Sequence, residues 1–378
     1  MNVDVVAAIT GSCVHYRLEL LDPYHKMSGK EYVLFGLGNP LLDIQANTGT
    51  DVLEKYGLKA NDAILAEDKH KPIYDELMTK YDAKFLAGGA AQNAMRGAQY
   101  VLPPKSTVYV GCVGKDKFAE QLHAANEREG LRTEYLVDES TPTGKCGVVI
   151  TGNNRSLVTD LAAANNYKLE HLKSPEIWKL VENAEFFYVG GFHLTVCVDA
   201  IKALGEHAAE TNKTFVMNLS APFLCQFFKD GMDAVTPYWD YILGNESEAA
   251  AWAEAHGLET TSVQEIAEHI AALPKANNKR ERTVVFTQGA ESVIVARPGK
   301  ETVVYPVPKL SDDEIVDTNG AGDAFAGAFL GMLVKGESLE TCVEAGTWLA
   351  QLAIKEVGPS FPYPKHGFMS SKAGIVTK

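Results

Sequence analysis

From about residue 185 onward, short apolar segments rich in β-branched and aromatic residues alternate with segments of helical periodicity. The strand segments are apolar throughout, as expected when helices cover both faces of a sheet. The predicted strands are residues 186–189, 214–217, 241–243 and 284–287, with helices at 246–256 and 263–273. The pattern therefore predicts an α/β fold with a doubly wound, mostly parallel sheet flanked by helices.

The end of the chain adds a hairpin and two buried helices to this sheet. Two apolar runs, residues 293–296 and 303–307, flank the turn Arg297-Pro298-Gly299-Lys300, which predicts an antiparallel hairpin. Residues 323–334 are rich in Gly and Ala, and residues 341–355 are apolar on most faces. Helices of that composition belong in the interior of a protein.

Two earlier segments, residues 40–87 and 140–160, lack the strand–helix alternation and suggest short alternating strands. Gly152-Asn153-Asn154 is a strong hairpin turn between two of them. We expect both segments to form one small β-rich lid on a single α/β domain of residues 27–378. Residues 1–26 are expected to be an extension outside the folded unit.

Charge and cysteine content exclude several classes of function. The chain has 49 Asp and Glu against 35 Lys and Arg, and this net charge of -14 argues against binding nucleic acid or an anionic membrane. The six cysteines are scattered without metal-ligand or disulfide spacing, which favours a reducing compartment such as the cytoplasm, with the nucleus as an alternative. No apolar run approaches the ~20 residues of a membrane span.

Residues 317–323 (DTNGAGD) lead directly into a predicted helix. Small residues at a helix start leave backbone N–H groups exposed, and with the helix dipole they form an anion site. A carboxylate there, Asp323, can take a proton from a hydroxyl while the N–H groups stabilise a phosphoryl group. The alternative is a glycine-rich loop capped by Asn319 and Asp323.

Residues 36–43 (GLGNPLLD) place two glycines at the end of a strand. A dinucleotide-binding fingerprint needs a third glycine where this chain has Leu41, so a nicotinamide dehydrogenase is disfavoured. Asp43 has two acceptor oxygens and can bind both hydroxyls of a vicinal diol such as ribose. Capping of a turn is the alternative for Asp43.

Two further segments could contact a ligand. Gly88 and Gly89 precede a helical run and allow close approach of the backbone, with Asn93 within the first helical turn. Arg155 lies beside the hairpin turn of the predicted lid, where an Arg can clamp a transferring phosphoryl group. A helix start that needs positive φ and a solvated surface Arg are the alternatives.

Polar residues also follow two of the predicted parallel strands, where open α/β sheets bind ligands. Asn245 and Glu248 follow one strand, and Thr287 and Gly289 follow the other. Glu248 is a candidate for holding magnesium through water. Helix capping by Asn245 and the acids of the first turn is the alternative.

Residues 317–323, followed by AFAG, resemble the second signature of the ribokinase-type carbohydrate and purine kinases. Further segments, in order between about residue 31 and about residue 364, resemble the members that phosphorylate adenosine. These segments are residues 38–43 (GNPLLD), 64–68 (ILAED), 88–89 (GG), 153–157 (NNRSL), 161–165 (LAAAN), 218–222 (NLSAP) and 286–289 (FTQG).

The resemblance implies ATP- and magnesium-dependent phosphorylation of the 5′-hydroxyl of adenosine by a monomeric, ribokinase-like enzyme. Asp323 would be the general base, the amides of Gly320, Ala321 and Gly322 the anion hole, and Arg155 a lid residue that moves in. The nucleoside would contact Asn39, Leu41, Asp43, Leu65, Gly88, Gly89, Asn93, Cys146, Leu157 and Phe192, with the Phe192 ring stacked on adenine. ATP would contact Asn245, Glu248, Thr287, Gly289 and Asn319, and a potassium-type ion near Asp317 and Thr318 is a further option.

The chain departs from animal relatives at Ala63, Ala90 and Thr159, where they tend to have Gln, Ser and Ala, and these changes concern base discrimination. Two alternatives share the predicted sheet: a kinase of free sugars and a non-catalytic nucleoside-binding protein. Apolar residues such as Leu41 and Phe192 suit a base better than a small polyol. The intact Asp323 argues against loss of catalysis.

Overall fold

The computed structural model describes residues 30–60, 62–152 and 154–370, so the predicted extension at residues 1–26 lies outside the described part. The described residues from Glu31 onward form one compact unit. Its larger sheet consists of β1 (Leu34–Leu37), β5 (Thr107–Gly114), β6 (Arg132–Asp138), β9 (Phe186–Gly190), β10 (Thr214–Asn218), β11 (Tyr241–Asn245), β12 (Thr283–Thr287), β13 (Ser292–Ala296) and β14 (Val303–Pro306).

The strand order of the nine-stranded sheet is β14-β13-β12-β11-β10-β9-β1-β5-β6. All neighbours from β6 to β12 pair in parallel, whereas β12, β13 and β14 pair antiparallel. The expected doubly wound, mostly parallel sheet with a terminal hairpin is therefore confirmed. The sheet reverses its direction of growth at β1, because β5 and β6 follow on one side and β9 to β12 on the other.

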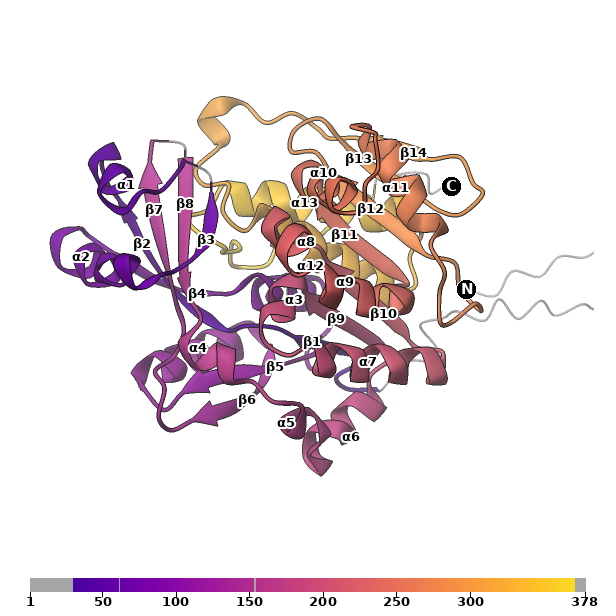
Figure 1. Ribbon diagram of the computed structural model, residues 1–378, viewed down its shortest axis with the longest axis horizontal. Coiled ribbons are helices and arrows are strands. Elements are labelled where there is room, and N and C mark those ends of the chain that lie inside the picture. Colours follow the sequence, from indigo (N-terminus) through magenta and orange to yellow (C-terminus); the bar gives the residue numbers. More distant parts are fainter. Residues whose placement is uncertain (1–29, 61, 153, 371–378) are drawn as a thin grey trace, which may run out of the picture. The chain divides into compact units, whose positions relative to one another are not determined.

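Helices cover both faces of this sheet (Figure 1). The period-two alternation of β1 shows the two faces: a Cβ on Gly36 would meet Met95 at 2.6 Å, whereas Phe35 and Leu37 belong to the core on the opposite side. The helices on the side of Met95 are α3 (Ala90–Val101), α12 (Ala321–Val334) and α13 (Leu339–Ile354). α4 (Lys117–Glu129) contacts α3 on the same side. The remaining helices are α5 (Leu169–Lys173), α6 (Pro175–Asn183), α7 (Val198–Thr211), α8 (Pro222–Phe227), α9 (Lys229–Val235), α10 (Glu246–Ala255) and α11 (Val263–Ala272).

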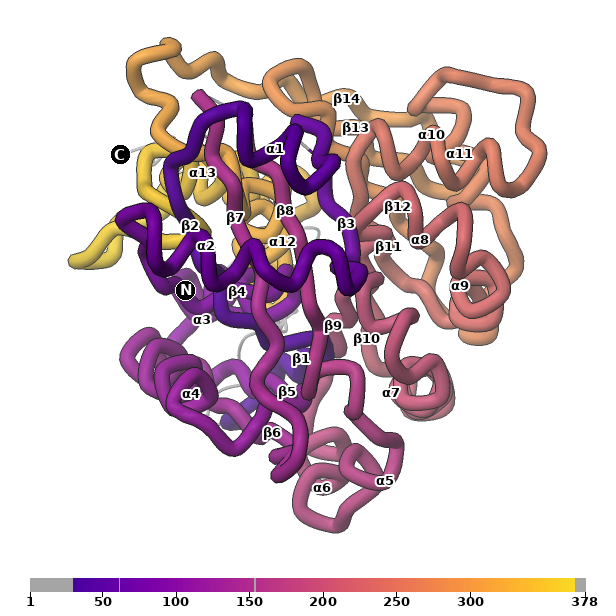
Figure 2. Tube along the Cα trace, turned by 60° about the vertical axis from the view of Figure 1, so that its left-hand side comes forward, coloured from indigo at the N-terminus to yellow at the C-terminus, as the bar shows by residue number. Residues whose placement is uncertain are grey.

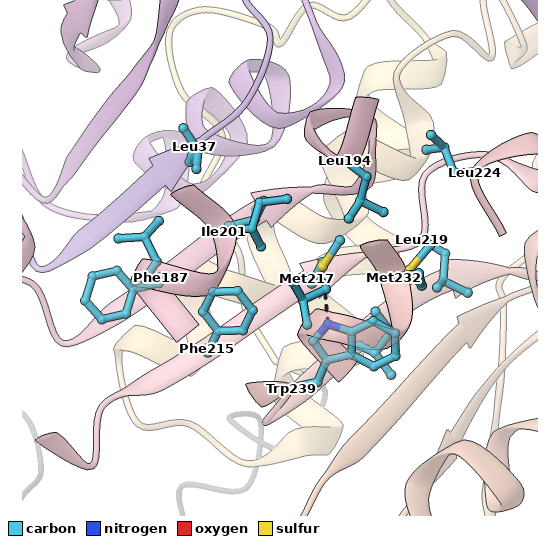
Figure 3. Packing of buried hydrophobic residues seen from close by; sticks show 14 of the residues in the cluster. Leu37, Phe187, Leu194, Ile201, Phe215, Met217, Leu219, Leu224, Met232 and Trp239 are labelled. Atoms are coloured by element: carbon cyan, nitrogen blue, oxygen red, sulfur yellow. Dashed lines mark hydrogen bonds between the residues drawn. The ribbon is translucent and has the colours of Figure 1, made fainter. Parts of the chain in front are cut away.

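The larger core lies between the sheet and α7, α10 and α11, and Figure 3 shows its centre. Trp239 is fully buried there, and its indole N–H donates to the sulfur of Met217 at 3.2 Å. Phe187 and Phe215 extend the same apolar layer on neighbouring strands. This apolar layer fixes the positions of the strand ends. The loops that follow the strands can therefore hold the residues of a binding site in place.

A second sheet stands at one end of the first, with α1 and α2 beside it (Figures 1 and 2). Its strands are β2 (Leu41–Asn47), β3 (Ala63–Leu65), β4 (Lys84–Gly88), β7 (Lys145–Thr151) and β8 (Asn154–Asp160), in the order β3-β8-β7-β2-β4. Its helices are α1 (Thr50–Tyr56) and α2 (Pro72–Lys80).

The sequence prediction for residues 40–87 was wrong in detail, because it contained strands alone. α1 and α2 interrupt the strands and cover one face of the second sheet. Leu53 of α1 and Ile73 and Leu77 of α2 form one core with Ile44 of β2. Burial on both faces also explains why β2 and β7 do not alternate with polar residues. No helix in the described ranges is long and apolar enough to cross a membrane.

Candidate active site

A deep hollow opens at the carboxyl ends of β1 and β9, where the strand order of the larger sheet reverses. Such a reversal leaves a crevice between loops that diverge to opposite faces, and ligands bind there in open α/β sheets. The second sheet forms the opposite wall through β2, β3, β7 and β8. The lining residues are Gly38, Asn39, Leu41, Asp43, Ala63, Ile64, Leu65, Gly89, Ala90, Ala91, Asn93, Cys146, Leu157, Thr159, Leu161, Gly190, Phe192, His193, Thr195, Phe223, Asn319 and Asp323.

The structure brings nine of the ten predicted nucleoside contacts to this hollow, and Gly88 is the exception. Gly88 lies directly behind the Asp43 carboxylate, so that a Cβ at this position would overlap it. Asp43 is the third residue of β2, within the second sheet, and not near the end of the first strand as the spacing suggested. The departures Ala63, Ala90 and Thr159 also line the hollow.

Aromatic and aliphatic side chains make one side of the hollow apolar. Phe192 lies in the short 3-10 helix Gly191–Thr195 after β9, and its ring centroid is 6.1 Å from that of Phe223. Leu41 and Leu157 come from the second sheet. A flat heterocycle can be held between two such walls by its faces.

At the other side, Asp323 lies in the first turn of α12. Its Oδ2 accepts a hydrogen bond of 3.0 Å from Nδ2 of Asn93 on α3. Arg96 holds Asn93 in turn, donating to Asn93 Oδ1 at 3.3 Å and to the carbonyl oxygen of Ala87 at 3.0 Å. Burial raises the pKa of Asp323 to about 7, against the lowering effect of the Asn93 hydrogen bond and the Arg96 charge. A carboxylate with this pKa is suited to proton transfer near neutral pH.

The backbone at the start of α12 has the conformation that an anion site requires. Gly320 has φ of 79°, and a Cβ there would also lie 2.6 Å from Pro359, so glycine is required twice over. A Cβ on Gly322 would have no atom within 4 Å, which leaves open space beside this amide. One expectation needs correction: the N–H of Ala321 is not bare, because it donates to the carbonyl oxygen of Thr318 at 3.3 Å.

A second hollow opens on the same helix start from the side of β12 and α13. Thr287 and Gly289 line it as expected, together with Thr318, Ala321 and Gly322. Asn319 lines the first hollow instead, next to Asp323. The first turn of α12 therefore separates the two hollows and takes part in both.

Asn245 and Glu248 line neither hollow. They form a capping box at the start of α10: Asn245 Oδ1 accepts from the Glu248 N–H, and Glu248 Oε2 accepts from the Asn245 N–H at 3.0 Å. Glu248 Oε1 also accepts from Asn245 Nδ2 at 3.0 Å. These contacts are those of a helix cap, which was the alternative interpretation of Asn245 and Glu248 from the sequence. Burial raises the pKa of Glu248 to about 7.

The Asp43 carboxylate is buried, with 5% of the residue exposed. Its pKa rises to about 7, first because of burial and then because of the negative charge of Asp323, while Arg96 acts in the opposite direction. An acceptor in this state makes strong hydrogen bonds once hydroxyl donors reach it, since water does not compete.

Asp317 joins the second sheet to the loop that precedes α12. Its Oδ1 accepts from Arg155 Nε at 2.8 Å and from the Asn319 N–H at 2.9 Å. Its Oδ2 accepts from Gln45 Nε2 at 2.8 Å and from the Gly358 N–H at 2.9 Å. Arg155 also donates to the Val316 carbonyl oxygen at 3.1 Å. The predicted lid residue Arg155 is thus docked beside the helix start.

Sequence reasoning missed the residues that support the site. Arg96 is buried with a salt bridge of 2.6 Å to Glu129, and its only sequence signal is its position one turn after Asn93. Phe223 follows a Pro at the start of α8, and nothing in the local sequence indicated that its side chain lines the hollow. His193 was interpreted as a packing or rim residue, and the structure places it fully buried in the wall of the first hollow.

Comparisons with known proteins agree with this geometry. The pfkB family of carbohydrate kinases matches residues 51–366. An adenosine kinase from Schizosaccharomyces pombe is 54% identical over 339 residues, which cover 89% of this chain and 98% of that protein. The crystal structure of Anopheles gambiae adenosine kinase in complex with P1,P4-di(adenosine-5) tetraphosphate has a TM-score of 0.85 at 43% identity, covering 87% of this chain and 98% of that one. Adenosine kinase from Schistosoma mansoni in complex with 2-fluoroadenosine has a TM-score of 0.85 at 38% identity, covering 88% and 98%.

Proposed function

This chain belongs to the pfkB family of carbohydrate kinases, and on that premise we propose that it transfers the γ-phosphate of ATP to the 5′-hydroxyl of adenosine. The products are AMP and ADP, so the reaction returns a free nucleoside to the nucleotide pool as purine salvage. Adenosine kinases that are 54% and 43% identical to this chain along nearly their whole length support this assignment.

The single observation that carries the proposal is the place of the α12 start between the two hollows. A phosphoryl group passing from one hollow to the other would cross the amides of Gly320 and Gly322 beside Asp323. The ligand in the Anopheles gambiae structure is named as two adenosines joined by four phosphates, and such a molecule suits two hollows that meet at one anion site.

In the first hollow, we assign the ribose diol to Asp43, with Gly88 giving the carboxylate room. The base lies against Phe192 and Leu41, and Asn93 and Gly89 complete the floor. This arrangement directs the 5′-hydroxyl to Asp323, which takes its proton as the oxygen attacks phosphorus. Because the transition state is loose, holding the reactants in line contributes more than covalent chemistry.

On the phosphate side, the Gly320 and Gly322 amides and the positive end of the α12 dipole stabilise the charge that develops on the γ-phosphoryl oxygens. Arg155 approaches the same region from β8, and its exchange between Asp317 and the phosphate would tie docking of the second sheet to catalysis. Closure of that sheet over the hollow excludes water, which prevents hydrolysis of ATP.

Magnesium and a monovalent cation differ in how well the residues fit them. No three His, Cys, Asp or Glu side chains gather as a metal cage within the described ranges, so magnesium would arrive with the ATP phosphates, whose charge it neutralises. Glu248 does not fit the predicted magnesium contact through water, because it lines neither hollow and both its oxygens accept hydrogen bonds from Asn245. Asp317 does not fit a potassium-type ion, because N–H donors occupy both its oxygens and a guanidinium already supplies the positive charge.

We further infer a monomer of the cytoplasm or nucleus, since one chain lines both hollows and the five cysteines in the described ranges are free thiols. The test of the function is release of ADP from ATP with adenosine, ribose and fructose as acceptors. We expect kcat/KM for adenosine to exceed that for either sugar by several orders of magnitude. Comparable values for ribose would assign the chain to sugar phosphorylation, and adenosine binding without ADP release would make it a binding protein.

A further inference from the structure

His193 lies fully buried behind the first hollow, directly after Phe192. Its Nδ1 is 2.7 Å from Oδ1 of Asn39, which lies in the loop between β1 and β2 and lines the same hollow. Asn39 Nδ2 in turn donates to the backbone carbonyl oxygen of Phe192 at 3.2 Å. Three residues from two loops thus form one short hydrogen-bonded chain beside the nucleoside position.

The direction of every hydrogen bond in this chain follows from one fixed member. A backbone carbonyl oxygen can only accept, so the Asn39 atom that faces Phe192 must be the nitrogen. The Asn39 atom that faces His193 is then the oxygen, and His193 must donate to it from Nδ1. Nδ1 therefore carries a proton, and the buried Nε2 has no hydrogen-bond partner among the described residues.

The surroundings hold His193 in its neutral form. Burial lowers the pKa of the imidazole to about 3, because no water stabilises the charged ring. The ring of Tyr167 packs edge-on at 5.2 Å between centroids and restricts rotation of the imidazole. A ring with one tautomer and one orientation is a rigid hydrogen-bond donor.

We propose that His193 is a positioning residue for base recognition, which locks the side-chain amide of Asn39 so that it cannot turn over to suit a different base. Asn39 then keeps one N–H and one lone pair on fixed sides. We assign the N1 and C6 edge of the base to Asn39 as part of this proposal: adenine is then accepted, and a 6-oxopurine such as that of inosine, in which ring N1 changes from acceptor to donor, is disfavoured. The inference rests on the proposed function for the identity of the base.

Three variants separate the donor from the volume of the ring. His193→Phe keeps most of the volume and removes the donor, whereas His193→Asn retains an N–H near the position of Nδ1. His207→Phe is the matched control, because His207 is half-buried against Trp178 and Phe187, away from both hollows. Adenosine and inosine are compared with each enzyme in a coupled ADP-release assay at saturating ATP.

For His193→Phe, we expect KM for adenosine to rise about 5- to 50-fold, with kcat and KM for ATP within about threefold of the wild type. The preference for adenosine over inosine in kcat/KM should fall about tenfold, since one of two anchors of the amide is lost. His193→Asn should restore both values to within about threefold. A purely structural role would lower the melting temperature without this split between the two substrates.

Two results would overturn the proposal: an unchanged adenosine KM in His193→Phe, or a defect in His193→Asn as large as in His193→Phe. If His193→Phe does not fold, His193→Asn and Asn39→Leu still test the proposal. A locked amide predicts that Asn39→Leu loses the preference for adenosine over inosine, whereas His193→Asn keeps it. Lack of turnover in the wild type would refute the proposed function instead, and calorimetric binding of adenosine and inosine to the same variants would then measure the selectivity directly.

Discussion

Replacing Asp43 by Asn should stabilise the ligand-free protein at alkaline pH and weaken its binding of adenosine. The carboxylate is 5% exposed and its pKa is raised from 3.8 to about 7. The buried charge lowers the stability of the ligand-free protein, because the surrounding wall is apolar. A ligand that donates hydrogen bonds to the carboxylate offsets this cost, so the group serves binding at the expense of stability.

The size of the effect follows from proton linkage. A folded pKa about 3 units above the unfolded value corresponds to about 4 kcal/mol at pH values well above 7, at about 1.4 kcal/mol per unit. The unfolded carboxyl group ionises near pH 4 and the folded one near pH 7, so the stability of the wild type is complete below pH 4 and falls as the pH rises to 7. A buried Asn amide also needs partners, which reduces the expected gain of Asp43→Asn to about 1–3 kcal/mol at pH 8.

The assay is thermal unfolding without ligand at pH 5, 6, 7 and 8. We expect Asp43→Asn to melt several degrees above the wild type at pH 8, with the difference shrinking toward pH 5. The matched control is Asp82→Asn, because Asp82 is exposed on the loop before β4 and its substitution should leave the melting curve unchanged. Calorimetry on the same samples should show at least a tenfold weaker binding of adenosine, since Asn replaces one of the two acceptor oxygens by an NH2 group and leaves the other uncharged.

Two results would refute this reasoning. A gain that is equal at pH 5 and pH 8 would show that the effect comes from packing and not from ionisation. A loss of stability at pH 8 would show that the carboxylate has internal partners that outweigh its burial. In either case the charge of Asp43 would not be the cause of a lower stability that is exchanged for tighter adenosine binding.

Further predictions concern the catalytic turn. Asp323→Asn should lower kcat about 10²- to 10⁴-fold in the ADP-release assay, with adenosine binding retained in calorimetry. In the wild type, kcat/KM should fall about tenfold per pH unit below pH 7, because burial raises the Asp323 pKa to about 7 and the protonated form cannot act as a base. Gly320→Ala should abolish activity and lower the melting temperature, since φ is 79° and Pro359 is in the way, whereas Gly322→Ala has open space and should fold as the wild type does. Arg155→Gln and Asp317→Asn should show strong non-additivity in a double-mutant cycle on kcat/KM, and additive effects would mean that their 2.8 Å contact does not act in catalysis.

The fold was predictable from sequence because its signals are local. The apolar strands β9 to β12 have helices between them, and the turn at 297–300 marks the final hairpin. The sequence did not predict α1 and α2 inside residues 40–87, because α1 is only seven residues long and α2 begins at a Pro after a turn. Short helices in a segment that also contains strands have too few periods to show an apolar stripe.

Part of the lining of the first hollow, including nine of the ten named nucleoside contacts, was also predictable, although through resemblance to a family more than through spacing. Asp43 illustrates the limit: the spacing suggested the end of a strand, and the residue lies inside a strand of a different sheet. The support of the site was hidden for a different reason. Arg96 and His193 act through partners that are far away in sequence, such as Glu129 and Asn39, and no local pattern reveals such pairs.

Burial raises the pKa of three acids, Asp43, Asp323 and Glu248, to about 7, and the negative charge of Asp323 adds to the rise at the other two. Their shared cause is burial, so each keeps its charge only at a cost to stability. Asp317 is also buried, but each of its oxygens accepts two hydrogen bonds, and one of the four donors is a guanidinium. The contrast separates the acids by role: Asp43 and Asp323, which serve substrate binding and proton transfer, have few donors, whereas Asp317, which joins the second sheet to the catalytic turn, has a donor at every acceptor position. A site built in this way gains stability when adenosine arrives, since the ribose hydroxyls supply hydrogen-bond donors that the free enzyme lacks.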